Sequence, residues 1–219
     1  MIKAVVFDLD GTLVNSLFDL AASTNYALKK FGYPTHELEA YKIFIGDGMP
    51  KLIERTLPES KRDSETIAKV LEEFLAYYRK HYLDKTVLYD GIFELLNDLQ
   101  KSGYKLCVVS NKSNEMTTEI IKNLFEIKFN SFTGKKEGYK AKPDPKLTLE
   151  IINSIGVNPN ECAFIGDSGM DMQTAVNANC LPIGVLWGFR GKEELLQNGA
   201  KYLVNKPNEI LEILNEKSL

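Results

Sequence analysis

Residues 5–12 read Val5-Val6-Phe7-Asp8-Leu9-Asp10-Gly11-Thr12, a short apolar run that ends in two acids and a glycine. Alternate residues of an extended chain project to the same side, so the carboxylates of Asp8 and Asp10 are expected to lie together where the strand ends. Two neighbouring carboxylates repel each other unless a cation neutralises them or one takes a proton. The stretch therefore predicts a divalent metal, an acid–base role, or both.

Two later apolar runs end in a similar way. Residues 106–109 lead into Ser110 and Asn111, and residues 163–166 lead into Asp167, with Asp171 four positions further on. In parallel α/β sheets the ligand lies beyond the carboxyl ends of the strands. Carboxylates for a hard cation and donors for an anion would thus meet at one point, which suits a phosphate held against Mg²⁺.

The order of helical and strand patterns predicts the fold class. Strands are expected near 3–8, 104–110, 131–133, 162–166, 181–186 and 201–204, and helices at 92–101, 114–124, 145–155, 169–178, 192–198 and 207–216. This alternation predicts an α/β fold, a Rossmann-like parallel sheet with helices on both faces. Residues 15–86 carry helical patterns alone and indicate an inserted all-helical cap, because a strand crossover usually needs one helix. The expected domains are a core of residues 1–14 and 87–219 and a cap of residues 15–86.

The overall composition excludes several classes of protein. The 219 residues are 44% hydrophobic and 26% charged, which is typical of a packed chain, and the net charge of −3 gives no reason to expect nucleic-acid or membrane partners. The N-terminal apolar run is too short for a secretion signal, and no stretch approaches the roughly 18 apolar residues of a membrane span. We expect a cytoplasmic protein, a monomer by default with a dimer as the alternative. The cysteines at 107, 162 and 180 form no close ligand pairs and are expected to be buried packing residues.

The acids suggest a specific reaction. Asp8 would attack phosphorus to form an aspartyl-phosphate, and Asp10 would protonate the leaving oxygen and later deprotonate water. Asp167 would complete the Mg²⁺ site with Asp8, and Asp171 would support that site from behind. Two plainer readings stay open: Asp171 as an ordinary acid in the first turn of a helix, and the Asp-x-Asp-Gly run as a turn. An EF-hand loop is excluded because Leu13 stands where that loop needs glycine.

The phosphate itself needs donors and a positive charge. We expect Gly11, Thr12, Ser110 and Asn111 to face the phosphate oxygens, with Ser110 among the catalytic residues. Lys142 is the candidate cation that offsets the charge of the transferring phosphoryl group. The alternative for Lys142 is a solvated position in a lysine-rich loop.

The residues around Lys142 also predict how the next helix begins. Lys142 precedes Pro143-Asp144-Pro145, which predicts Asp144 as the helix N-cap and Pro145 as the first helical residue. Elsewhere in the chain, Trp187 and Arg190 follow a strand end and are candidates for the rim of the site.

One loop of the cap is a candidate for contact with the rest of the substrate. Gly46 and Asp47 lie between two short helical segments, where a lid would meet the part of the substrate that is not phosphate. Lys51 and Arg55 follow one helical turn apart and could meet an anion. The alternatives are a plain helix–helix turn and a solvated helix face.

Four motifs, taken in order, resemble those of the haloacid dehalogenase superfamily of aspartyl-phosphate phosphatases. They read Asp8-Leu9-Asp10-Gly11-Thr12, Ser110-Asn111, Lys142-Pro143 and Gly166-Asp167-Ser168 with Asp171. The resemblance covers essentially the whole chain, and Gly32-Tyr33-Pro34 and Gly184-Val185-Leu186-Trp187-Gly188 are similar to the phosphoglycolate phosphatase branch. It implies Asp8 as nucleophile, Asp10 as acid–base, and Mg²⁺ held by Asp8, Asp167 and the backbone carbonyl of Asp10.

Some positions depart from that branch and leave the substrate open. Asn15 replaces a usual Asp, Ser110 stands where Thr is frequent, Asp90 is where Pro is common before Gly91, and Asn179 replaces a usual Gly. We expect a small phosphorylated metabolite as substrate, with 2-phosphoglycolate leading. A generalist phosphatase for sugar phosphates and nucleotides is the alternative within the same chemistry.

Three other functions are weighed against a phosphatase. A phosphomutase of the same superfamily has Arg and His where this chain has Gly48 and Leu20, which argues for net hydrolysis. A haloacid dehalogenase lacks the second Asp of the first motif. A phosphoryl-accepting switch needs no cap of some seventy residues.

Overall fold

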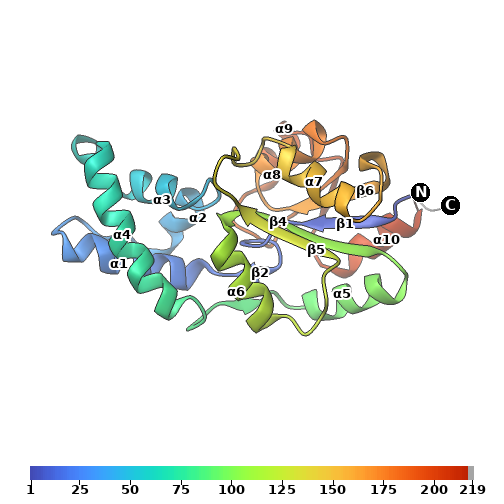
Figure 1. Cartoon of the computed structure of the whole chain (residues 1–219), viewed down its shortest axis with the longest axis horizontal. Coiled ribbons are helices and arrows are strands. Elements are labelled where there is room, and N and C mark those ends of the chain that lie inside the picture. Colours follow the sequence, from blue (N-terminus) through green and yellow to red (C-terminus); the bar gives the residue numbers. More distant parts are fainter. Residues whose placement is uncertain (217–219) are drawn as a thin grey trace. The chain divides into compact units, whose positions relative to one another are not determined.

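Residues 1–216 are described by the computed structural model, and the chain divides into two compact units (Figure 1). One unit joins Met1–Val14 to the chain from Leu88 onward, and the other is Asn15–Val87. The chain therefore passes between the units twice, at 14–15 and at 87–88. The two connecting segments, β2 (Val14–Asn15) and β3 (Val87–Leu88), pair as a two-stranded sheet.

The larger unit is built on one six-stranded sheet. Its strands are β1 (Ala4–Phe7), β4 (Lys105–Ser113), β5 (Ser131–Lys135), β6 (Cys162–Gly166), β7 (Leu181–Val185) and β8 (Tyr202–Val204). The order is β5-β4-β1-β6-β7-β8, and all neighbours pair in parallel. Because β1 lies between β4 and β6, the residues that follow these three strands meet at one edge of the sheet. The predicted parallel α/β fold is confirmed.

Helices cover both faces of this sheet (Figure 1). One face carries α5 (Ile92–Lys101), α6 (Asn114–Leu124) and α10 (Asn208–Glu216), and the other carries α7 (Lys146–Ser154), α8 (Gly169–Asn177) and α9 (Lys192–Gln197). Ala4 and Val6 of β1 pack with Ile152 of α7 and Ala175 of α8, all fully buried. Alternate residues of β1 thus face opposite layers, as an extended chain requires.

The three cysteines lie in this packed layer. Cys107, Cys162 and Cys180 are buried free thiols in the same apolar cluster. Burial raises the pKa of Cys107 to about 12, which keeps its thiol protonated. The expectation that the three cysteines are buried packing residues is confirmed.

The smaller unit is helical apart from its two ends. It contains α1 (Leu17–Lys30), α2 (Tyr41–Phe44), α3 (Met49–Thr56) and α4 (Ser64–His81), with short 3-10 turns at Leu38–Ala40 and Glu59–Lys61. Helices α1 and α4 pack together, and the buried carboxylate of Asp19 accepts bonds from the backbone N–H of Lys85 and of Thr86 at 3.0 and 2.8 Å. Asp19 thereby ties the start of α1 to the end of the same unit.

Most predicted element ends lie within two residues of the observed ones, and two of the differences bear on the site. Strand β4 continues to Ser113 instead of ending at residue 110. Helix α7 begins at Lys146, with Pro145 as its N-cap, so the prediction of Asp144 as N-cap was wrong by one residue. Asp144 still accepts a bond from the backbone N–H of Lys146 at 3.0 Å, so it serves the same helix end from one position earlier. Within residues 1–216, no helix combines the length and apolarity needed to cross a membrane.

Candidate active site

Three buried carboxylates meet at the carboxyl edge of the sheet. Asp8 follows β1, Asp167 follows β6, and Asp171 lies in the first turn of α8; each offers one oxygen, and these oxygens all lie within 4.8 Å of one another. The structure thus brings together three of the predicted acids. The side chain of Asp10 is not part of this group.

Lys142 joins the cluster from the loop before α7. Its ammonium nitrogen is 2.6 Å from Oδ1 of Asp8 and 2.5 Å from Oδ1 of Asp171, and its side chain is almost fully buried. The same nitrogen lies 3.3 Å from the backbone carbonyl oxygen of Val109. The solvated position considered for Lys142 in the sequence is excluded by this burial. A buried ammonium is stable here because carboxylates surround it.

The N-terminus of α8 holds Asp171 in place. Ser168 is the N-cap of this helix, and its hydroxyl donates to Oδ2 of Asp171 at 2.6 Å. The backbone N–H of Ser168 donates to the same oxygen at 3.0 Å. This reciprocal capping box leaves the other oxygen of Asp171 directed at Lys142. Asp171 therefore belongs to the capping box of α8 and also binds Lys142.

Asp167 is held by the loops that follow β1 and β7. The hydroxyl of Thr12 donates to Oδ1 of Asp167 at 3.3 Å, and the backbone N–H of Phe189 donates to Oδ2 at 2.7 Å. Gly11 lies against the same carboxylate with φ +90°, a conformation that favours glycine, and a Cβ there would overlap the carboxylate of Asp167. The predicted phosphate residues Gly11 and Thr12 thus lie beside Asp167.

The cluster carries more negative charge than Lys142 neutralises. Burial raises the pKa of Asp8 well above its usual range, against the opposing effect of Lys142 and with the help of Asp171. Burial, followed by repulsion from Asp171, raises the pKa of Asp167 to about 7. Burial alone would lower the pKa of Lys142, but Asp171 and Asp8 outweigh it and raise that pKa. The site therefore holds Lys142 protonated and favours an additional cation.

The end of β4 supplies the remaining predicted residues. Pairing with β5 loses its register between Val109 and Ser113, which places residues 110–112 in an irregular segment next to the acids. The side-chain oxygen of Asn111 accepts a bond from the backbone N–H of Lys142 at 2.7 Å, so Asn111 fixes the loop that carries the lysine. Ser110 is buried, and its hydroxyl accepts a bond from the backbone N–H of Lys112 at 3.2 Å.

Lys112 is the residue that the sequence reasoning did not assign to the site. Its ammonium nitrogen lies 3.0 and 2.9 Å from the two carboxylate oxygens of Asp10. The available signal was a lysine directly after an apolar strand and the Ser110-Asn111 pair. Asp8 and Asp10, which were expected to lie together, contact different lysines.

The predicted cap loop, Gly46–Asp47, belongs to the helical unit. Arg55 of α3 forms an ion pair with the carboxylate of Asp47 and donates to the backbone carbonyl of Phe44 at 3.0 Å. Lys51 pairs with Glu54 on the same helix at 2.8 Å. Arg55 therefore holds the Gly46–Asp47 loop, while Lys51 lies on an exposed helix face.

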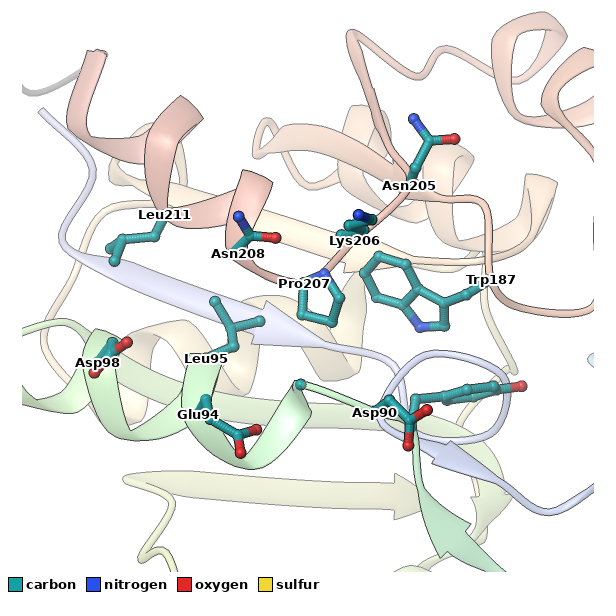
Figure 2. A pocket seen from close by; sticks show the side chains of 12 residues that line it. Asp90, Glu94, Leu95, Asp98, Trp187, Asn205, Lys206, Pro207, Asn208 and Leu211 are labelled. Atoms are coloured by element: carbon teal, nitrogen blue, oxygen red, sulfur yellow. The ribbon is translucent and has the colours of Figure 1, made fainter.

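A pocket of about 560 Å³ lies on the larger unit between α5 and α10 (Figure 2). Trp187, Leu95, Pro207 and Leu211 give it apolar walls, and none of the three clustered carboxylates lines it. The indole N–H of Trp187 donates to the backbone carbonyl of Thr12 at 3.0 Å. Trp187 thus lines a neighbouring pocket and supports the Gly11–Thr12 loop from outside.

The comparisons with known proteins agree on one family. Residues 5–185 match the family described as haloacid dehalogenase-like hydrolase. The chain belongs to the haloacid dehalogenase-like hydrolase family. A phosphoglycolate phosphatase of Haemophilus influenzae is 32% identical over 97% of this chain and 98% of its own length.

Solved structures of the family agree in fold over almost the whole chain. A structure from Lactobacillus delbrueckii subsp. bulgaricus superposes with a TM-score of 0.92 at 33% identity, covering 97% of this chain and 98% of its own. A predicted phosphoglycolate phosphatase from Haemophilus somnus superposes with a TM-score of 0.88 at 29% identity, covering 97% of each chain. The resemblance stated from the four motifs is confirmed, and so is the prediction that the chain is an enzyme, a phosphatase of the haloacid dehalogenase-like family.

Proposed function

We propose that the protein hydrolyses a small phosphorylated metabolite with Mg²⁺, through an aspartyl-phosphate on Asp8, and that 2-phosphoglycolate is its substrate. The observation that carries the proposal is the meeting of three buried carboxylates with Lys142 at the carboxyl edge of the sheet. Carboxylates alone would repel a phosphate, so a cation and Lys142 are both needed before the dianion can approach.

Asp8 is the proposed nucleophile. It lies where β1 ends, and its backbone N–H donates to the carbonyl of Ile165 at 2.9 Å, so its position is fixed by the centre of the sheet. Lys142 contacts one of its oxygens and favours the ionised form that attack requires. The attack forms a bond from a carboxylate oxygen to phosphorus while the ester oxygen departs.

Asp10 is the proposed general acid and base. Its side chain is 13% exposed and points to a different lysine from the one that Asp8 contacts. One carboxylate is thus assigned to attack and the other to proton transfer, first to the leaving oxygen and then from water. Lys142 is proposed to neutralise charge on the phosphoryl group during both steps, and Ser110 is proposed to orient it.

The donor set fits Mg²⁺. Oxygens of Asp8 and Asp167 lie in the same cluster, the pKa values of both groups are raised by burial and repulsion, and hard oxygen ligands are those that Mg²⁺ prefers. With the backbone carbonyl of Asp10, these two residues would hold the ion, and Asp171 would orient Lys142 beside it. Bound there, Mg²⁺ would neutralise the carboxylates and polarise the phosphate.

The choice of 2-phosphoglycolate rests on the relatives. The Haemophilus influenzae protein, similar over nearly its full length, is a phosphoglycolate phosphatase. Gly46 and Asp47 are proposed to contact the part of the substrate that is not phosphate, with Arg55 holding their loop. A cytoplasmic location and a monomeric state remain predictions from the sequence.

The test is the release of inorganic phosphate from a panel of phosphate esters, with Mg²⁺ and with Mg²⁺ removed by a chelator. We expect the highest kcat/KM with 2-phosphoglycolate, activity only with Mg²⁺, and a loss of more than about a thousandfold in Asp8→Asn. Broad, weak release across sugar phosphates and nucleotides would keep the chemistry and reject the substrate. Full turnover by Asp8→Asn would reject the nucleophile.

A further inference from the structure

A second buried lysine lies beside the first. The side chain of Lys112 is 0% exposed, and its ammonium nitrogen spans both carboxylate oxygens of Asp10 at 2.9 and 3.0 Å. Nothing in the proposed roles of Asp8, Asp167 and Lys142 requires this residue. Burying an ammonium costs free energy that an aliphatic side chain of the same size would not cost. Packing alone therefore does not explain why a lysine is buried against Asp10.

The backbone around Lys112 is fixed on both sides. Its N–H donates to the hydroxyl of Ser110, and its carbonyl oxygen lies where a Cβ on Gly134 would approach to 2.5 Å, so the neighbouring strand comes unusually close. The register break between β4 and β5 falls in this segment. Bulges of this kind redirect side chains beside active sites. Here the irregular segment contains the lysine that contacts Asp10.

The bidentate contact restricts Asp10 more than a single hydrogen bond would. One nitrogen that lies close to both oxygens sets the direction of the carboxyl group as well as its distance. Proton transfer to a leaving oxygen depends steeply on such placement, since a displacement of about 1 Å can cost about a hundredfold in rate. The side chain of Asp10 is 13% exposed, so water can compete for its carboxyl group, and the bidentate contact with Lys112 opposes that competition.

We propose that Lys112 is a positioning residue, which holds the carboxyl group of Asp10 in place for proton transfer with the leaving-group oxygen. The inference rests on the proposed phosphatase function and deepens it. In the first step, Asp8 forms its bond to phosphorus, the bond from phosphorus to the ester oxygen breaks, and the proton of Asp10 passes to that oxygen. In the second step Asp10 takes a proton from water as the water oxygen displaces Asp8 and releases inorganic phosphate.

The leaving group provides a test that a purely structural role would fail. An alkoxide is strongly basic and needs the proton of Asp10, whereas 4-nitrophenolate leaves readily as an anion. We therefore compare kcat/KM, which reports the first phosphoryl transfer, for 4-nitrophenyl phosphate and for the alkyl phosphate of the panel that the wild type hydrolyses best. Lys112→Met is expected to lower the alkyl value about a hundredfold and the aryl value less than about fivefold.

Two further variants make the result specific. Lys112→Gln retains one donor toward Asp10 and is expected to recover part of the alkyl activity. Lys105→Met removes a lysine from the other end of the same strand, where its ammonium contacts only the backbone carbonyl of Ile155 among the interactions described, and is expected to behave as wild type. If circular dichroism shows that Lys112→Met does not fold, the test uses the ratio of alkyl to aryl kcat/KM for Lys112→Gln, which is expected to lie below that of the wild type.

A double-mutant cycle asks whether Lys112 acts through Asp10. In an Asp10→Asn background, Lys112→Met is expected to change the alkyl kcat/KM by less than about twofold, because the group that it positions is gone. Equal losses on both substrates, or a full further loss in the Asp10→Asn background, would overturn the inference and leave the phosphatase intact. A wild-type protein that releases no phosphate from any ester would overturn the proposed function and this inference with it.

Discussion

Gly188 shows how little room the site leaves around one carboxylate. A Cβ at this position would overlap both the side chain of Asp167 and the backbone carbonyl oxygen of Gly11. Neither neighbour is a flexible chain end, since Asp167 is held by Thr12 and Phe189. We therefore expect Gly188→Ala to displace Asp167, to lower kcat/KM at least about tenfold and to raise the Mg²⁺ concentration needed for half-maximal rate.

Gly191 provides the matched control for this substitution. It lies three residues further on in the same loop, and a Cβ there would meet no atom within 4 Å. Gly191→Ala is expected to keep wild-type kcat/KM and the same Mg²⁺ dependence. Measured rates that fall equally in both variants would show that the loop as a whole, rather than its contact with Asp167, controls the activity.

The residue scale also shows what the sequence could and could not predict. Asp8, Asp167 and Lys142 were predictable, because the ends of neighbouring parallel strands must converge and a phosphate site needs both charges. The Lys112–Asp10 pair was not, since it depends on the register break in β4 and on which side chain that break directs at Asp10. The roles of all these residues stay predictions until variants are measured.

At the scale of elements, helices α6 and α8 both begin with a serine N-cap, but only one of the two serines also contacts the acid cluster. Ser113 caps α6 by accepting a bond from the backbone N–H of Met116, and Ser168 caps α8 while also donating to Asp171. Replacing either serine by alanine is expected to lower the free energy of unfolding by about 1 kcal/mol, measured in urea. Ser168→Ala alone is expected to lower kcat/KM several-fold, because Asp171 loses a partner and Lys142 loses its orientation.

Ser113→Ala is the matched control for Ser168→Ala. Both variants lose one cap, so a loss of activity that simply followed stability would appear in both to the same extent. Activity that falls only in Ser168→Ala would connect the helix cap to the acid cluster. Equal activities in the two variants would contradict that connection, whatever the change in stability.

The elements themselves followed largely from local sequence. Helices α5 and α6 have the predicted bounds, because apolar spacing, Gly103 and the Ser113 cap all agree on them. The structure departs from prediction where tertiary contacts decide. Strand β4 extends through polar residues, among them Lys112, which contacts Asp10, and α7 starts at Lys146 because Pro145 itself takes the capping position.

At the scale of the whole molecule, the buried acids couple stability to pH and to the cation. The usual pKa of an aspartate, 3.8, applies to the unfolded chain, whereas burial raises the pKa of Asp167 to about 7 in the folded protein. Between these values the folded state binds more protons than the unfolded state, so stability must fall as pH rises through this window. The raised pKa of Asp8 acts in the same direction.

Without Mg²⁺, the free energy of unfolding is therefore expected to be lower at about pH 8 than at about pH 5, by an amount on the order of a few kcal/mol. Mg²⁺ should reverse this trend, since it binds the ionised carboxylates and so stabilises the folded state most where protons compete least. The asparagine in Asp167→Asn does not titrate. The free energy of unfolding of this variant should therefore fall less with pH and increase less when Mg²⁺ is added. Thermal unfolding of both proteins across this range, with and without Mg²⁺, measures the difference. The prediction would be contradicted if, without Mg²⁺, the free energy of unfolding of the wild type rose with pH relative to that of Asp167→Asn. That result would show that the charge of the cluster is neutralised by other means.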